Sequence, residues 1–247
     1  GAYIRSREPN IKARMGLHVP TTGIMDVHAC MKRLAYKTET AGALISYGTR
    51  VTGVEKQQNA FKVTFEDGYA VQSDIVINAA GLFADEIAGM AGIDIDRAGY
   101  RLRYCKGQYY KTTKYRGMNR LIYPVPDPST GSLGIHTRLH LDGTLAFGPN
   151  AFYVQEMDYA FDHSYKDQVH QSVSTFMDID YADLHPDDAG IRPQLKPNGE
   201  NPTDFIIVNE KERGLNGLIN LIGIESPGLT SCLAIAEYIY TQVLPTV

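Results

Sequence analysis

The stretch Gly223–Thr230 places the strongest constraint on how this chain can fold. It follows the apolar run Leu218–Ile222, which has the length and composition of a buried strand. After it, apolar residues recur at the i, i+3, i+4 and i+7 spacing of an inner helical face: Leu229, Cys232, Leu233 and Ala236. Ser226 suits the N-cap of that helix and Pro227 its first residue. The sequence therefore predicts a strand, a glycine-bearing turn and a helix start.

The open N–H groups of such a helix start attract negative charge. Gly223–Thr230 is therefore either a seat for a cofactor or anion, or a tight connection that binds nothing. The same order occurs earlier, where the strand candidate 74–78 leads through Ala79-Ala80-Gly81 into a helix that ends at Gly92. Small residues in a turn let a bulky ligand approach the backbone closely. Two copies are also what two ordinary α/β connections would give, so both interpretations stay open.

Composition excludes several classes of protein. A hydrophobic content of 43% and a charged content of 21% describe an ordinary globular chain of one large or two modest domains. A net charge of −4 without a Lys/Arg cluster argues against nucleic acid as a partner. No apolar run reaches the roughly 18 residues that a membrane helix needs. We therefore expect no transmembrane segment and a cytoplasmic location, with peripheral membrane association left open.

The three cysteines Cys30, Cys105 and Cys232 are odd in number and far apart in the chain. They form neither a disulfide framework nor the pair spacing of metal ligands. Cys30 and Cys232 fall on apolar helical faces, which predicts buried free thiols. No metal site is expected.

The remaining pattern predicts an α/β chain of mixed α+β character. Residues 1–25 are expected to be irregular, and Asp26 caps a helix that ends at Gly42. A small antiparallel meander follows, with the Asp67-Gly68 pair as a hairpin turn, in strands 43–47, 51–55, 61–65 and 69–72. A second antiparallel sheet is predicted from strands 102–112, 120–125, 134–137 and 144–148. A helix over 166–177, a turn over 187–193 and a strand over 205–209 complete the pattern.

Six motifs in order carry a resemblance to a known family: 76–85, 107–110, 121–127, 148–151, 189–193 and 221–230. Together they closely resemble the L-2-hydroxyglutarate oxidase/dehydrogenase branch of the FAD-dependent oxidoreductases related to D-amino-acid and glycine oxidases. The resemblance implies an incomplete FAD/NAD(P)-binding-type domain joined to an antiparallel-sheet substrate domain. The cofactor domain would comprise residues 26–96 and 189–247, and the substrate domain residues 1–25 and 97–188.

The chain departs from that family at its start. Members begin with a strand and a G-x-G-x-x-G turn for the ADP half of FAD, and this sequence contains no such fingerprint. We therefore expect a C-terminal portion whose partner is a missing N-terminal nucleotide-binding segment, with an incomplete catalytic set.

This chain by itself should accordingly hold FAD weakly or not at all, because the ADP-binding turn is absent. The absorbance spectrum of the purified chain checks this expectation. A yellow preparation with stoichiometric flavin would contradict it.

The resemblance also implies cofactor contacts. Val51 would meet the adenine end of FAD, Ala79, Ala80 and Gly81 its nucleotide side, and Gln108 its flavin ring. The predicted helix start would lie at the N1 edge of the flavin and comprises the cofactor contacts Gly223, Ser226, Pro227, Gly228, Leu229 and Thr230. Thr230 and the N–H groups of Gly228 and Leu229 would stabilise the charge that develops there. The alternative is that Val51 and residues 79–81 are simply small or β-branched core residues. Glu225 is a doubtful contact, because its charge would oppose that of the reduced flavin.

A 2-hydroxy acid substrate, with L-2-hydroxyglutarate as the first candidate, needs a fixed cation and a base. Arg192 suits the carboxylate, because a guanidinium matches it with two parallel hydrogen bonds; a surface ion pair is the alternative. His136 is the candidate base or substrate contact, unless it is a hydrogen-bonded core residue. Tyr110 shares a strand face with Gln108 and could border the ring, whereas Tyr109 points to the opposite face.

Two other functions remain open at this point. The first is an amino-acid or secondary-amine oxidase of the glycine or sarcosine type, which would keep the flavin and change the substrate. The second is a non-catalytic binding module.

Overall fold

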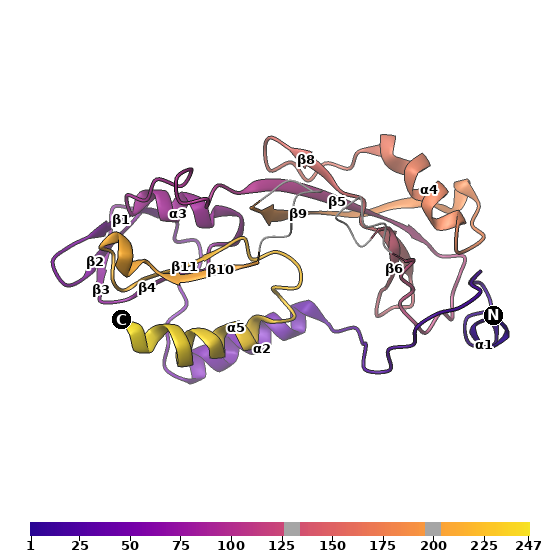
Figure 1. The fold of residues 1–247 in the computed structure, drawn as a ribbon, viewed down its shortest axis with the longest axis horizontal. Helices are drawn as coiled ribbons and strands as arrows, with labels where there is room; N and C mark the ends of the chain where they lie inside the picture. Colours follow the sequence, from indigo (N-terminus) through magenta and orange to yellow (C-terminus); the bar gives the residue numbers. More distant parts are fainter. Residues whose placement is uncertain (126–133, 196–203) are drawn as a thin grey trace. The chain divides into compact units, whose positions relative to one another are not determined.

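The computed structural model describes residues 1–125, 134–195 and 204–247 (Figure 1). They form two compact units, each described here by itself. Unit 1 comprises Gly1–Ile45, Lys106–Phe152 and Asp158–Ile191, and unit 2 comprises Ser46–Cys105, Tyr153–Met157 and Arg192–Val247. Residues 26–45, predicted to lie with the cofactor domain, are grouped by their contacts with unit 1. The roles assigned to the two predicted domains stay predictions.

A three-stranded sheet forms the centre of unit 2, in the order β10 (Ile206–Asn209), β11 (Leu218–Ile222) and β4 (Val76–Asn78). β11 runs antiparallel to β10 and parallel to β4. All five residues of β11 are buried, as its apolar composition predicts. Helical segments cover both faces of the sheet, α3 (Ala84–Met90) on one side and α5 (Cys232–Tyr238) on the other (Figure 1).

Alternate residues of β11 serve the two faces. Leu218 and Ile222 belong to the core that contains Ala84 and Ala88 of α3. Ile219 and Leu221 instead pack in a core with Ile239 and Val243, which lie on the π-helical turn Ile239–Val243 that continues α5. The two-residue period of a strand thus anchors both helices on β11.

The predicted meander is confirmed for three of its four strands: β1 (Val51–Lys56), β2 (Phe61–Phe65) and β3 (Ala70–Ser73). The Asp67-Gly68 turn joins β2 to β3, and Asp67 Oδ1 accepts the N–H of Tyr69 at 3.0 Å. Gly68 has a φ of 84°, which favours glycine. The strand predicted over 43–47 is wrong, because these residues form no ladder and turn at Gly48.

The antiparallel sheet pairs its strands in the order β6-β7-β5-β8, and β9 also pairs with β5. Its strands are β5 (Arg103–Thr112), β6 (His136–Leu139), β7 (Leu145–Gly148), β8 (Phe152–Val154) and β9 (His185–Gln194). Helix α4 (Lys166–Ser174) buries Val169 and Val173 in a core with Tyr110 and Phe147. This confirms the helix predicted in this region.

Two predicted elements of this region are wrong. Residues 187–193 form part of β9 rather than a turn, because β5 supplies a pairing partner and a strand paired on one side tolerates Pro193. Residues 120–125 form no strand; Ile122 alone exchanges hydrogen bonds with Thr137. The predicted motif over 121–127 continues into residues 126–127, which lie outside the described part of the chain.

Helix α2 (Val27–Thr40) begins as predicted, and Asp26 Oδ1 accepts the N–H of Ala29 at 2.9 Å. Its apolar face is not buried, since Val27 is 41% and Met31 52% exposed. A short helix, α1 (Ala2–Arg7), occupies part of the region predicted to be irregular. Five short 3-10 turns are also described: Gly81–Phe83, His163–Tyr165, Tyr181–Asp183, Glu210–Arg213 and Leu244–Thr246.

The helix predicted to begin at Ser226 and Pro227 begins instead at Cys232. The preceding residues fold back on themselves, because the N–H of Gly228 donates to the carbonyl of Glu225 and the N–H of Glu225 to that of Gly223. The prediction of buried thiols at Cys30 and Cys232 is also wrong: both are half-buried, and the buried cysteine is Cys105. Among the described residues, no helix is long and apolar enough to cross a membrane, and no three metal-ligating side chains cluster.

A buried polar network ties β4 and β11 to the turn Glu210–Arg213. Asn78 donates to Asn220 Oδ1 at 2.8 Å, and Asn220 donates to Glu210 Oε1 at 2.8 Å. The Tyr100 hydroxyl donates to the same carboxylate at 2.7 Å, and Arg213 pairs with its second oxygen at 2.7 Å. Burial, followed by the Glu210 carboxylate, raises the pKa of Tyr100. Asn220, Tyr100 and Arg213 thus all donate to the carboxylate of buried Glu210.

Replacing Glu210 by Ala should lower the free energy of unfolding by about 3 kcal/mol, because the Asn220 amide and the Tyr100 hydroxyl lose a buried acceptor. Urea denaturation measures the change. Glu212→Ala is the matched control: Glu212 lies in the same turn and is exposed, so its loss should stay within about 0.5 kcal/mol. Equal losses in the two variants would show that the network contributes nothing.

Candidate functional site

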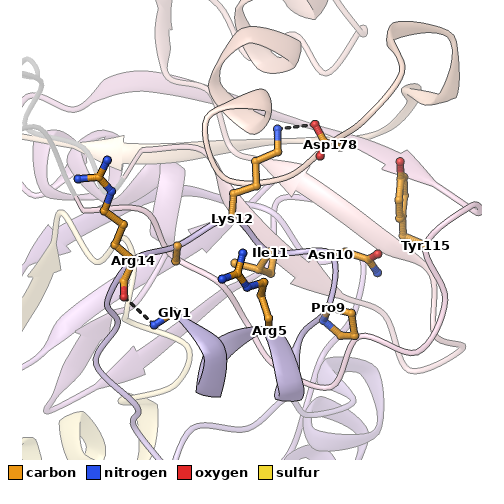
Figure 2. Close-up of a pocket in the computed structure, with 10 residues that line it drawn as sticks. Gly1, Arg5, Pro9, Asn10, Ile11, Lys12, Arg14, Tyr115 and Asp178 are labelled. Atoms are coloured by element: carbon orange, nitrogen blue, oxygen red, sulfur yellow. Dashed lines mark hydrogen bonds and ion pairs between the residues drawn. The ribbon is translucent and has the colours of Figure 1, made fainter.

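A pocket of about 730 Å³ lies in unit 1, beside α1 and the segment that follows it (Figure 2). Arg5, Lys12 and Arg14 line it, and the Lys12 ammonium is paired with Asp178. The backbone nitrogen of Gly1 donates to the Arg14 carbonyl at 2.8 Å. None of the residues predicted to bind the cofactor or the substrate lines this pocket, so the candidate site lies elsewhere.

A second pocket, of about 490 Å³, lies in unit 2 between the carboxyl ends of β4 and β11 and the helical segment that begins with α5. It contains three of the predicted cofactor residues: Ala79, Gly81 and Gly228. The rest of its wall is mainly aliphatic and consists of Ile77, Leu221, Ile224, Cys232, Ile235, Ala236, Ile239, Tyr240 and Leu244. Its size and apolar wall are those of a small-molecule site.

Glycines shape this pocket in two different ways. Gly81 has a φ of 58°, and a Cβ there would meet no atom within 4 Å, so the backbone is open to a ligand. At Gly228, a Cβ would lie 2.5 Å from the Ile224 side chain and 2.7 Å from the Glu225 carbonyl. At Gly223, with a φ of 71°, it would lie 2.7 Å from Leu195. Gly228 is therefore required by the tight turn, and Gly223 by its positive φ and the close approach of Leu195, whereas the space around Gly81 is open.

The segment Ser226–Thr230 is exposed except for Gly228. Its hydroxyl-bearing Thr230 donates to the Pro227 carbonyl at 2.9 Å. Because α5 begins only at Cys232, the predicted donors do not form the first turn of a helix. The prediction of the Gly228 N–H as a donor to the flavin is wrong, because this group donates to the Glu225 carbonyl within the turn. In the described residues, the N–H groups of Leu229 and Thr230 donate to no backbone carbonyl, so they remain available to a ligand.

Arg192 lies near the end of β9, in unit 2, and contacts two groups. Its Nη2 atom lies 3.1 Å from Cys105 Sγ, and its Nη1 atom lies 3.6 Å from Glu225 Oε2. The side chains of Arg192 and Glu225 are 31% and 26% exposed. Arg192, predicted to bind the substrate carboxylate, thus already has the Glu225 carboxylate beside it. The sequence had suggested Glu225 only as a doubtful contact of the flavin.

Glu225 is held by a second, uncharged donor. Gln194 Nε2 lies 3.0 Å from one carboxylate oxygen and 3.3 Å from the other. Gln194 is buried, and its Oε1 accepts the Tyr153 hydroxyl at 2.6 Å. This hydrogen bond orients the Gln194 amide so that its NH2 group faces Glu225.

His136 is a buried residue of β6 in unit 1, stacked on Tyr123 with ring centroids 4.2 Å apart. Its Nδ1 lies 2.9 Å from the Gly134 carbonyl, which can only accept, so Nδ1 carries a proton. Burial lowers the pKa of His136, and Arg138 lowers it further, against the opposing effect of the Gly134 carbonyl. A neutral ring therefore keeps Nε2 as a proton acceptor; its role in the reaction stays a prediction.

Gln108 and Tyr110 share one face of β5, as predicted, but that face is fully buried in unit 1. The Gln108 amide donates to the Asp162 carbonyl and accepts the Asp162 N–H, at 3.0 and 3.2 Å. Tyr110 packs edge-on against Phe161, and its hydroxyl has no hydrogen-bond partner among the described residues. Burial raises the pKa of Tyr110 to about 12. Their proposed contacts with a flavin stay predictions.

Val51 and Ala80, like most of the predicted cofactor residues, do not line the pocket. Val51 begins β1 and packs on the core that contains Ala84 and Leu218. Ala80 is half-buried in the turn after β4, and its N–H donates to Asn78 Oδ1 at 3.3 Å. Both positions also suit the alternative of ordinary core residues.

Solved flavoenzymes share this fold. Glycine oxidase from Bacillus cereus superposes with a TM-score of 0.75 at 15% identity, over 96% of this chain and 62% of that one. L-alpha-glycerophosphate oxidase from Mycoplasma pneumoniae, in a structure with FAD bound, gives a TM-score of 0.68 at 23% identity, over 83% and 53% of the two chains. The fold is therefore that of the FAD-dependent oxidoreductases.

The sequence comparison identifies the family. The family described as "DAO: FAD dependent oxidoreductase" matches residues 1–241. The chain therefore belongs to the DAO family of FAD-dependent oxidoreductases, as its motifs predicted.

Curated relatives carry one recurring activity. The mitochondrial L-2-hydroxyglutarate dehydrogenase of Arabidopsis thaliana is 29% identical, over 96% of this chain and 58% of its own length. The L-2-hydroxyglutarate dehydrogenase of Escherichia coli K12 is 24% identical, over 97% of this chain and 64% of its own length. The chain thus spans less than two thirds of the length of these two relatives.

The donor set fits part of the family's cofactor. An aliphatic slot with an open backbone at Gly81 suits a flat aromatic group, and the unused N–H groups at Leu229 and Thr230 suit an anionic edge. The helical wall was only half predicted: Cys232 and Ala236 line the pocket, whereas Leu233 is 68% exposed. Sequence reasoning missed Gln194 and Tyr153, because their link to Glu225 depends on pairing between distant segments.

The pKa of buried His136 lies below its ordinary value of about 6.5. As the pH falls, His136 is therefore protonated at a higher pH in the unfolded chain than in the folded one. The free energy of unfolding should therefore fall as the pH drops below about 6.5, and His136→Gln should remove part of that fall. Urea denaturation at about pH 7.5 and about pH 5.5 measures it. His28→Gln, at an exposed position of α2, is the control that should keep the original slope. An unchanged slope in His136→Gln would contradict the prediction.

Proposed function

We propose that this chain is part of an FAD-dependent oxidoreductase that oxidises a 2-hydroxy acid, with L-2-hydroxyglutarate as substrate and 2-oxoglutarate as product. The observation that carries the proposal is the apolar pocket in unit 2, which gathers Ala79, Gly81 and Gly228 from two separate parts of the chain. The activity named for the Arabidopsis and Escherichia coli relatives supports the choice of substrate.

FAD, when bound, supplies the acceptor for the hydride that leaves the α-carbon of the substrate. The residues proposed to hold it are those of the pocket, together with Val51 and Ala80 toward its nucleotide end. Gly223 and Gly228 keep the turn tight, and the N–H groups of Leu229 and Thr230 donate to the edge where negative charge develops. Fixed donors of this kind need no reorganisation during the reaction.

Arg192 is proposed to bind the substrate carboxylate. A guanidinium is always charged and presents its donors in a fixed fork. The contacts with Cys105 and Glu225 hold this fork in place, so part of the ordering cost of substrate binding is already met in the free protein.

The competing hypothesis is an amino-acid or secondary-amine oxidase, which would bind FAD in the same pocket and act on a different substrate. An amino acid also carries a carboxylate for Arg192, and glycine oxidase shares the fold. A non-catalytic binding module would bind a ligand without transferring electrons. Substrate-dependent flavin reduction separates all three.

In the full-length protein loaded with FAD, L-2-hydroxyglutarate should bleach the flavin absorbance under anaerobic conditions, with 2-oxoglutarate formed in equal amount. D-2-hydroxyglutarate, glycine, sarcosine and L-glutamate are run in parallel. Reduction by the amines alone would replace the proposal with an amine oxidase, and a flavin that none of these compounds reduces would exclude both activities.

A further inference from the structure

Arg192 and Glu225 form an ion pair without a direct hydrogen bond between their side chains. Nη1 of Arg192 and Oε2 of Glu225 are 3.6 Å apart, beyond an ordinary hydrogen bond, and both side chains are partly exposed. The other end of the guanidinium is fixed by Cys105 Sγ at 3.1 Å. The two side chains are therefore held in place and accessible to solvent, and a ligand could bind to both.

The Glu225 carboxylate is also oriented by a neutral donor, the Gln194 amide. Gln194 donates to it, and the Tyr153 hydroxyl donates to Gln194, so an uncharged relay of two side chains fixes its position. An ionised carboxylate has about four acceptor sites, and these contacts leave acceptor capacity for an incoming donor.

The turn that carries Glu225 also forms a wall of the candidate pocket. Ile224 and Gly228, on either side of Glu225 in the sequence, both line it. The backbone of Glu225 is held at both ends, because its N–H donates to Gly223 and its carbonyl accepts from Gly228. Glu225 is therefore fixed beside the pocket by its own backbone as well as by Gln194.

A 2-hydroxy acid carries a carboxylate and a hydroxyl group on adjacent carbons. A neighbouring cation and anion complement these two groups, the cation for the carboxylate and the anion for the O–H proton. We propose that Arg192 and Glu225 together recognise the 2-hydroxy carboxylate, and that Glu225 is the catalytic residue that accepts the hydroxyl proton. This inference rests on the proposed function and assigns its base.

The step balances without a further reactant. The substrate O–H bond breaks and its proton goes to the Glu225 carboxylate, while the C–H bond breaks and its electron pair leaves with the hydride for FAD. A carbonyl forms between the same carbon and oxygen. Directly after the step, the protonated Glu225 can donate to the new carbonyl oxygen. Once Glu225 has released its proton to solvent, the 2-oxo acid has no donor for the carboxylate, so the ionised protein favours substrate over product.

Kinetics of the full-length FAD-loaded protein test the assignment. Glu225→Gln keeps the shape and removes the base, so kcat should fall by about 10²- to 10⁴-fold while KM changes much less. The acid limb of the pH profile of kcat/KM should also disappear. Glu225→Asp should recover part of kcat, and Arg192→Lys should act mainly on KM. Glu212→Gln, at an exposed glutamate, should leave kcat, KM and the pH profile unchanged.

Equilibrium binding supplies a readout that does not depend on turnover. The fully reduced protein cannot oxidise the substrate, so its anaerobic titration with L-2-hydroxyglutarate and with glutarate measures how much the hydroxyl group adds to affinity. In Glu225→Ala that ratio should fall toward one, even if loss of the charge strengthens the binding of both ligands. The flavin content of each variant identifies any that fails to fold, and the test then rests on Glu225→Asp and Glu225→Gln.

The outcomes separate the two proposals. If the wild-type protein oxidises L-2-hydroxyglutarate but Glu225→Gln keeps its kcat within about threefold and its pH profile, Glu225 is not the base and the proposed function stands. If no 2-hydroxy acid reduces the flavin of the wild-type protein, the proposed function is wrong, and so is the role assigned to Glu225.

Discussion

The pairing of Asn78 with Asn220 across β4 and β11 is the interaction on which the candidate site depends. Both amides are buried at matched positions of two parallel strands, 2.8 Å apart. A polar group in that position must find a partner, so the strands are held in one register and other alignments are penalised. Asn78 also donates to the Ala84 carbonyl at 2.7 Å, which fixes the turn between them. Ala79 and Gly81 are thereby placed beside the end of β11, where the pocket forms.

Charge in unit 2 is arranged in two different environments. Glu210 is fully buried and surrounded by donors, so it serves the structure. Glu225 is partly exposed, lies beside Arg192 and retains acceptor capacity, so it can serve chemistry. The same side-chain type therefore has two roles, which solvent access and unused hydrogen-bonding capacity distinguish.

Sequence reasoning reached most of the elements and the family, but fewer of the contacts. Apolar runs such as Leu218–Ile222 and turn signals such as Asp67-Gly68 depend on local pattern, and both are confirmed. The turn predicted over 187–193 is wrong, because Gly190 and Pro193 are typical of turns and their pairing with the distant strand β5 is not visible in the local pattern. The helix start was misplaced from Cys232 to Ser226, because an N-cap signal cannot reveal that Gly228 folds back onto Glu225.

By itself, the sequence determined the family, the central strands and the small residues of the pocket, since each depends on residue type and short-range spacing. Only the tertiary structure decided that Gln108 and Tyr110 face a packed core, and that Ala79 and Gly228 share one cavity. The tertiary structure also decided that Arg192 lies beside Glu225. A motif can single out Arg192 as a cation, but it cannot show which distant carboxylate is its partner. The physical reason is that burial and ion pairing arise between segments far apart in the chain, whereas periodicity and turn chemistry are local.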